Sequence, residues 1–247
     1  MQGFKLKMLS TAVGAAALLG ASSVFAGITA NLENGKNIFN NGKGDVPACN
    51  SCHGPQGMGD DNTGAPRLAG QVFQFIVKQL EDFATDKRQD TTMYVMNANA
   101  KGLSSQDRID VAAYVNSLPA VEAEYSKLGD LKANGTAVGE TYLGKIIVNY
   151  GVPERGIPAC KSCHDYNGRG VDPVYPRIGG QKYVYLVNQL KKWRDGSRAN
   201  DPLAQMQKVA QKLSDEDINN VAAFLTSAPP TTMGNSRVPA EHLPFKH

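Results

Sequence analysis

The chain has 247 residues, with 26 Lys and Arg against 23 Asp and Glu, and 41% of its residues are hydrophobic. These values exclude a disordered chain and a polytopic membrane protein, and a formal net charge of +3 is too small for a general nucleic-acid binder. Only four residues are Cys, which is too few for a disulfide-dense scaffold. They form two pairs with the same internal spacing.

Residues 1–26 are predicted to be a signal peptide. Lys5 and Lys7 precede an uncharged run of small and apolar residues, and Val24-Phe25-Ala26 resembles a small-residue cleavage site. An uncleaved anchor is the alternative, but the run is short and its Ser, Thr and Gly weaken it as a membrane span. We therefore expect an exported protein, most simply one of a bacterial periplasm.

The rest of the chain repeats itself with a period of about 110 residues. Pro47–His53 recurs as Pro158–His164, and Pro66–Gln71 recurs as Pro176–Gln181. The matches continue to the last helix of each repeat, which indicates a tandem duplication of a small domain and not a solenoid. The predicted parts are a first domain at 27–118, a linker at 119–138, a second domain at 139–228 and a C-terminal tail at 229–247.

Apolar residues in both repeats are spaced for helices, and no useful run alternates as a strand would. The last helix of each repeat should begin after Ser104 or Ser214, because an Asp follows three residues later as in a capping box. The fold class is therefore all-α. The earlier helices are expected at 32–40 and 71–84 in the first repeat, and at 140–149 and from residue 183 in the second.

Glycines in the first helix of each repeat are expected to permit a close helix crossing. Gly35 would face Tyr114, and Gly144 would face Phe224. This role is packing and not chemistry.

Each cysteine pair has the spacing of a c-type haem attachment motif. The motifs are Cys49-x-x-Cys52-His53 and Cys160-x-x-Cys163-His164. Two thiols three residues apart reach the two vinyl groups on one porphyrin edge, and the following His can bind the iron. We predict two covalently attached haem c groups, one in each repeat, which also supply apolar mass to a small core.

Other uses of the cysteine pairs explain less. A thioredoxin-like disulfide needs a βαβ context, and ordinary structural disulfides do not explain the adjacent His. A zinc site could use two Cys-x-x-Cys pairs, but these pairs lie in separate repeats.

The second iron ligand of each haem is predicted to be a methionine. Only Met96 and Met206 occupy equivalent positions, whereas Met93 is a rival in the first repeat and Met58 is too close to His53. His/Met ligation leaves no open position on the iron, which favours transfer of single electrons over substrate chemistry.

Two further pairs of residues are predicted to support the haems. Pro66 and Pro176 lie after the haem-binding turns, where a backbone carbonyl could accept the Nδ1 proton of the proximal His. Arg67 and Arg177 could pair with haem propionates, with a solvated surface position as the alternative.

With these motifs the chain resembles the class I cytochrome c domain, present twice, and more closely the di-haem cytochrome c4 family. The resemblance covers about residues 30–228 and rests on the haem motifs, the Pro-Arg-(Leu/Ile)-(Ala/Gly)-Gly-Gln segments, Met96 and Met206. It implies two cytochrome c folds related by a pseudo-twofold axis. It also implies a periplasmic electron carrier, often peripherally membrane-associated, that takes electrons from an upstream dehydrogenase or quinol-oxidising complex and delivers them to a terminal oxidase.

Three other functions compete with that of a free electron carrier. The chain could be the electron-accepting subunit of a dehydrogenase such as a sulfide-oxidising flavocytochrome. A di-haem peroxidase needs an open haem, and a thiosulfate dehydrogenase uses an additional Cys ligand that is not left here. We therefore expect an electron-transfer protein that is not itself an enzyme, with neither a small-molecule substrate nor a nucleic-acid partner.

Charge differs between the halves. Residues 27–118 carry 8 basic and 10 acidic side chains, whereas residues 139–247 carry 14 basic and 10 acidic ones. Glu81-Asp82 in one half corresponds to Lys191-Lys192 in the other. One hypothesis is that the halves dock different redox partners by electrostatic complementarity.

Overall fold

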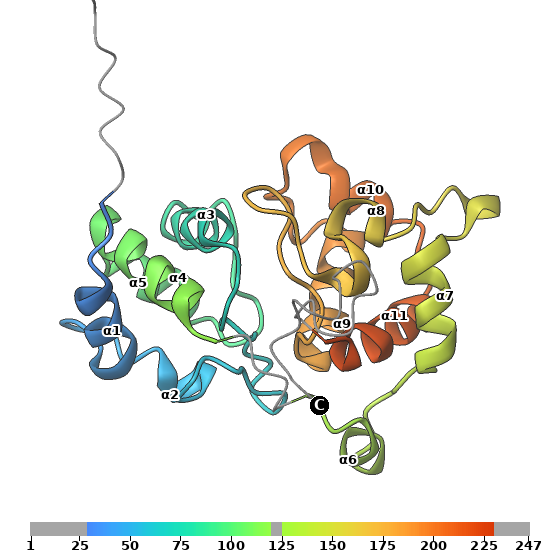
Figure 1. Ribbon diagram of the computed structural model, residues 1–247, viewed down its shortest axis with the longest axis horizontal. Coiled ribbons are helices and arrows are strands. Elements are labelled where there is room, and N and C mark those ends of the chain that lie inside the picture. The colour runs from blue at the N-terminus through green and yellow to red at the C-terminus, as the bar shows by residue number, and fades with distance from the viewer. Residues whose placement is uncertain (1–28, 120–124, 230–247) are drawn as a thin grey trace, which may run out of the picture.

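The computed structural model describes residues 29–119 and 125–229. The predicted signal peptide, and all but the first residue of the predicted tail, lie outside these ranges. Within them the regular elements are all helices, accompanied by four isolated β-bridges. The helices form two groups that lie beside one another (Figure 1). None of the described helices is long and apolar enough to cross a membrane.

The order of helices in the first group repeats in the second. The first group consists of α1 (Leu32–Asn41), α2 (Asn50–His53), α3 (Phe73–Ala84), α4 (Met96–Lys101) and α5 (Ser105–Ser117). The second consists of α7 (Thr141–Tyr150), α8 (Lys161–His164), α9 (Tyr183–Asp195), α10 (Gln205–Ala210) and α11 (Asp215–Ser227), with short 3-10 turns at Pro153–Arg155, Tyr166–Gly168 and Pro202–Ala204. The predicted all-α class and the duplication are confirmed.

In each domain the first and last helices cross in direct contact, as the glycines predict. A Cβ built on Gly35 would lie 2.1 Å from the carbonyl oxygen of Asp110, and one on Gly144 would lie 1.8 Å from that of Asn220. The same Cβ atoms would lie 3.0 Å from the Cβ of Tyr114 and 2.9 Å from that of Phe224. Only glycine allows the backbones to approach this closely.

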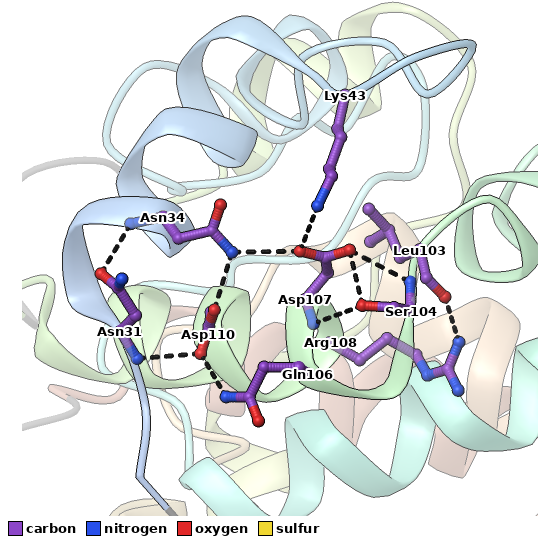
Figure 2. Close-up of polar contacts among 9 residues, drawn as sticks. All are labelled: Asn31, Asn34, Lys43, Leu103, Ser104, Gln106, Asp107, Arg108 and Asp110. Carbon is purple, nitrogen blue, oxygen red and sulfur yellow. Dashed lines mark hydrogen bonds and ion pairs between the residues drawn. The ribbon is translucent and has the colours of Figure 1, made fainter.

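The capping boxes of α5 and α11 are both present. In the first domain Asp107 also accepts hydrogen bonds from Lys43 Nζ (2.7 Å) and Asn34 Nδ2 (3.0 Å), so it joins the start of α5 to α1 and the loop after it (Figure 2). In the second domain Asp217 instead accepts two hydrogen bonds from Arg155, at 2.6 and 2.9 Å. The Asp of each capping box therefore caps the last helix of its domain and also ties that helix to residues near the start of the domain.

The segment predicted as a linker contains a short helix, α6 (Leu128–Ala133). Leu128 and Leu131 pack against the core of the second domain. Tyr183 at the start of α9 donates from its backbone N–H to Ser126 Oγ (2.8 Å) and from its hydroxyl to Ala137 O (2.7 Å). This part of the chain is therefore docked on the second domain.

Candidate haem-binding site

Each Cys-x-x-Cys-His motif forms a single helical turn. The N–H of His53 donates to Cys49 O at 3.0 Å, and that of His164 donates to Cys160 O at 2.9 Å. None of the four cysteines forms a disulfide. Burial raises the pKa of the Cys49 and Cys160 thiols to about 11. Each turn therefore presents two cysteine side chains and an imidazole together, as haem attachment needs.

The histidine of each motif contacts the proline that was predicted to support it. Nδ1 of His53 lies 2.9 Å from Pro66 O, and Nδ1 of His164 lies 2.9 Å from Pro176 O. A carbonyl can only accept, so Nδ1 carries the proton in both rings. Burial lowers the pKa of both histidines, which keeps the rings neutral. Each Nε2 is then left with the lone pair that a metal ligand needs.

A single, mainly apolar cavity of about 460 Å³ runs through both domains. Its volume lies in the range of ordinary cofactor pockets, about 300–1,000 Å³. The donor set fits haem c in both domains, because thiols, a neutral imidazole and a thioether all face apolar walls. Its walls include Cys49, Cys52, His53, Met96, Cys160, Cys163, His164 and Met206.

The arrangement of the cysteines does not match a zinc site. In the described parts of the chain, no group of three or more His, Cys, Asp or Glu side chains is placed to hold a metal ion. The two cysteine pairs stay in separate domains.

A carboxylate organises each methionine loop, which sequence reasoning missed. Asp90 accepts hydrogen bonds from four backbone N–H groups, including those of Met93 and Met96 at 3.2 Å each. Asp201 accepts from the N–H of Met206 at 2.6 Å. The repeat offered a signal, since each Asp precedes the start of a methionine helix. Met93 also lines the cavity, but 47% of it is exposed.

Two buried arginines face the cavity where the domains meet, and sequence alignment of the repeats gave them no role. Arg88 donates to the neutral side-chain carbonyls of Gln79 and Gln189 and to the hydroxyl of Tyr185. Burial, together with the nearby Arg88, lowers the pKa of Arg198 to about 9. Anionic groups would offset this crowding of cations, and the carboxylates of haem have that charge.

The arginines predicted from sequence also line the cavity. Arg67 is buried, and Arg177 is partly buried. Their contacts with propionates stay a prediction.

The domain interface is reciprocal. Gln71 Oε1 accepts from Arg177 N (2.7 Å), and its Nε2 donates to Arg177 O (2.8 Å). Gln181 does the same with Arg67, accepting at 2.6 Å and donating at 3.0 Å. A contact in which each half uses the same residue on the other is the sign of a twofold relation. The expected pseudo-twofold arrangement is therefore confirmed.

The charges suggested for partner docking are largely used within the molecule. Lys192 Nζ donates to Thr92 Oγ1 across the interface at 2.7 Å. Asp82 Oδ2 accepts from Asn200 Nδ2 across the interface at 2.6 Å. Lys191 pairs with Asp215 at 3.7 Å in its own domain. Lys192 and Asp82 therefore take part in domain pairing, whereas Lys191 is tied within its own domain, so charge reversal at Lys191 and Lys192 would not isolate a docking effect.

Comparison with known proteins decides the family. The family model for cytochrome c matches residues 32–119 and 158–229. The chain is a di-haem cytochrome c of the cytochrome c4 type. Cytochrome c4 of Pseudomonas aeruginosa is 34% identical over 188 residues, covering 74% of this chain and 85% of that one. The crystal structure of cytochrome c4 from Pseudomonas stutzeri matches with a TM-score of 0.64 and 29% identity, over 81% of this chain and 100% of that one. This family carries two covalent haem c groups, one for each Cys-x-x-Cys-His motif.

Other similar proteins belong to thiosulfate oxidation. A thiosulfate dehydrogenase electron acceptor of Stutzerimonas stutzeri is 32% identical over 212 residues, covering 85% of this chain and 93% of the relative. The structure of thiosulfate dehydrogenase (TsdBA) from Marichromatium purpuratum matches with a TM-score of 0.72 and 31% identity. That match covers 87% of this chain but only 44% of the other.

These similarities contradict the expectation of an electron-transfer protein that is not itself an enzyme, for which thiosulfate dehydrogenase was set aside. The expectation rested on the absence of an additional Cys ligand. That criterion asks only whether this chain carries such a ligand, and it cannot detect a component that receives electrons from another one. The chain is related to thiosulfate dehydrogenase systems through proteins named as electron acceptors.

Proposed function

We propose that this chain is a periplasmic di-haem electron acceptor for a thiosulfate dehydrogenase and that it passes the electrons on to a further redox protein, such as a terminal oxidase. The observation that carries the proposal is similarity to two proteins with that acceptor name, at 32% and 36% identity over 93% and 80% of their lengths. The basic n-region and cleavage site of residues 1–26 support export.

In this proposal His53 with Met96, and His164 with Met206, would hold the two haem irons. A bound haem c supplies a one-electron iron couple. The protein orients each proximal ring through its Nδ1–H···O bond and keeps that ring neutral. Asp90 and Asp201 hold the methionine loops against the cavity, and the apolar walls exclude water. An iron held by both a His and a Met would favour electron transfer over the binding of other ligands.

Reduction by thiosulfate tests the proposal. The oxidised holoprotein is mixed with a purified thiosulfate dehydrogenase and thiosulfate, and haem reduction is followed by absorbance. We expect rapid reduction of both haems that requires both the enzyme and thiosulfate. Sulfide with a sulfide-oxidising flavoprotein provides the competing donor.

Controls omit either the enzyme or thiosulfate, and a single-haem cytochrome c serves as a non-cognate acceptor. Reduction no faster than that of the non-cognate cytochrome would overturn the assignment to thiosulfate oxidation. Faster reduction by the sulfide-oxidising flavoprotein would replace it with the flavocytochrome alternative.

A further inference from the structure

We propose that Gln71 and Gln181 are positioning residues that act crosswise: each one holds the segment that supports the proximal histidine of the other domain. The proposal rests on His53 and His164 being iron ligands, as in the proposed function. It does not depend on thiosulfate.

The contact is specific because the amide of one side chain binds both the backbone N–H and the backbone carbonyl of one residue. We call this pair of hydrogen bonds the grip. Gln71 accepts from the N–H of Arg177 and donates to its carbonyl, at 2.7 and 2.8 Å. Arg177 directly follows Pro176, whose carbonyl accepts the Nδ1 proton of His164. Gln71 of the first domain is therefore linked, through Arg177 and Pro176, to the imidazole ring of His164 in the second domain.

The same path runs in the opposite direction. Gln181 accepts from the N–H of Arg67 at 2.6 Å and donates to its carbonyl at 3.0 Å. Arg67 follows Pro66, which accepts from His53. The neighbouring residues Leu68 and Ile178 donate within their own domains, to Gly57 O and Gly168 O at 2.7 Å each, so the contact from the other domain acts on Arg67 and Arg177 themselves.

Each glutamine is fixed firmly in its own domain. Both side chains are 5% exposed. Gln71 Oε1 also accepts from Val72 N at 2.9 Å, and the carbonyl of Gln71 accepts from Asn116 Nδ2 at 2.7 Å. The adjacent Gly70 donates to Val115 O in α5 at 2.9 Å. Through these hydrogen bonds, the last helix of the first domain fixes where Gln71 lies. Gln71 in turn fixes the loop of the second domain that contains Pro176 and Arg177.

Removing the grip should be felt at the iron of the other domain. Loss of the Gln71 amide would leave the N–H and C=O of Arg177 without this partner in a buried interface, so the loop would shift to restore hydrogen bonds. The Pro176 carbonyl moves with it, and a weaker bond to Nδ1 makes His164 a poorer donor to iron. His53 would be spared, because its loop is held by Gln181.

The test compares Gln71→Met with Gln181→Met in the holoprotein, since methionine keeps the length of glutamine but loses its hydrogen bonds. The readouts are the potential of each haem and the NMR signals of each proximal ring, assigned through the Cys and His of its motif. For Gln71→Met we expect the His164 signals to move and the reduced-to-oxidised ratio of the second-domain haem to change about tenfold at fixed potential, the lower end of such effects. Gln181→Met should move His53 and the first-domain haem instead.

Gln74→Met is the matched control, because Gln74 lies exposed on α3 and takes no part in the grip. It should move neither ring. Gln71→Asn, which is one methylene too short to reach Arg177, covers the case in which the methionine variant fails to fold, and the same crossed pattern is expected.

A shift mainly at the haem of the substituted domain, an equal shift at both haems, or no shift at either would overturn the proposal. Failure of thiosulfate-dependent reduction would leave the crossed pattern unaffected. Failure of the crossed pattern would leave the proposed function unaffected.

Discussion

Asp90 and Asp201 hold a methionine loop against each end of the cavity. Asp90 gathers four backbone N–H groups, and burial, which alone would raise its pKa, is outweighed by these hydrogen bonds, so its pKa is lowered. A carboxylate that stays charged keeps the turn before Met96 closed. Asp201 binds the N–H groups of Met206 and Gln207 in the same way.

Substituting the methionines tests the axial ligands. Met96→Ala and Met206→Ala should each remove about half of the Met-to-iron absorption band of the oxidised protein, because each would empty one of two axial positions. Met93→Ala should leave the band unchanged, since Met93 is half exposed and has no counterpart in the second domain. Visible absorption of the oxidised protein provides the measurement. Loss of the band in Met93→Ala, with Met96→Ala unchanged, would transfer the ligand role to Met93.

The buried arginine pair sets the charge around the haems. Replacing Arg88 or Arg198 with Gln removes a cation, which should stabilise the oxidised iron. The free energy of haem reduction should become less favourable by about 1 kcal/mol, and the haem potentials should fall. Redox titration measures this change. Arg194→Gln is the control, because Arg194 is only partly buried, does not line the cavity and pairs with the exposed Asp215. Unchanged potentials in both cavity variants would show that these arginines do not sense the haem charge.

Among the structural elements, the crossings of α1 with α5 and of α7 with α11 hold each domain together around its haem. The backbones meet at a glycine in both crossings, so the helix surfaces lie closer than side chains would allow. The second crossing is the tighter one, at Gly144 against Asn220.

Gly144→Ala should therefore destabilise the protein by about 1–3 kcal/mol, as overpacking does. Gly129→Ala is the control, because nothing lies within 4 Å of its Cβ position in α6. That change should stabilise by up to about 1 kcal/mol through helix propensity. Urea unfolding of the holoproteins compares the two. Equal stability of the two variants would mean that the α7–α11 crossing can open at little cost.

At this scale the elements followed from sequence wherever a local pattern specified them. Ser104 and Asp107 predicted the start of α5, and Gly35 predicted the close crossing of α1 with α5. Helix α6 was missed because Leu128 and Leu131 give only one i, i+3 pair, and because the residues that flank it, Ser126 and Ala137, are held by hydrogen bonds from Tyr183 far along the chain.

For the whole molecule, the haem motifs and the duplication were visible in the sequence because they are local or repeated. The interface was not. Gln71 and Arg177 are 106 residues apart, and Arg88 and Gln189 are 101 apart. No local periodicity reports such pairings, and the relevant polar residues look like ordinary surface positions until the domains are placed together.

Acid stability is a property of the whole fold that rests partly on the capping carboxylates. Hydrogen bonds from Arg155 lower the pKa of Asp217 to about 2, below the value of about 3.9 for an unperturbed Asp. A depressed pKa contributes stability above the unfolded value and loses it as pH falls from about 4 to about 2. Arg155→Gln should therefore reduce stability at neutral pH and flatten its loss in this acid window.

Urea midpoints measured across pH check this prediction. Arg194→Gln breaks an ion pair with Asp215, whose side chain is 63% exposed, and should change the curve less. An acid transition of Arg155→Gln as steep as that of the unchanged protein would exclude Asp217 as its source.

The grip between the domains has a consequence for how the two halves can diverge. Gln71 and Gln181 bind main-chain atoms, so the contact survives any side chain at positions 67 and 177 that leaves the backbone in place. Substitutions at these two positions need no compensating change in the opposite half. Chimaeric chains that join the first half of one relative to the second half of another should therefore still pair, provided that they retain both glutamines and the side-chain pairs across the interface, such as Lys192 with Thr92 and Arg88 with Gln189. After a gene duplication, exchange of halves between relatives can thus bring together domains with different surface residues while the contacts between the domains stay the same.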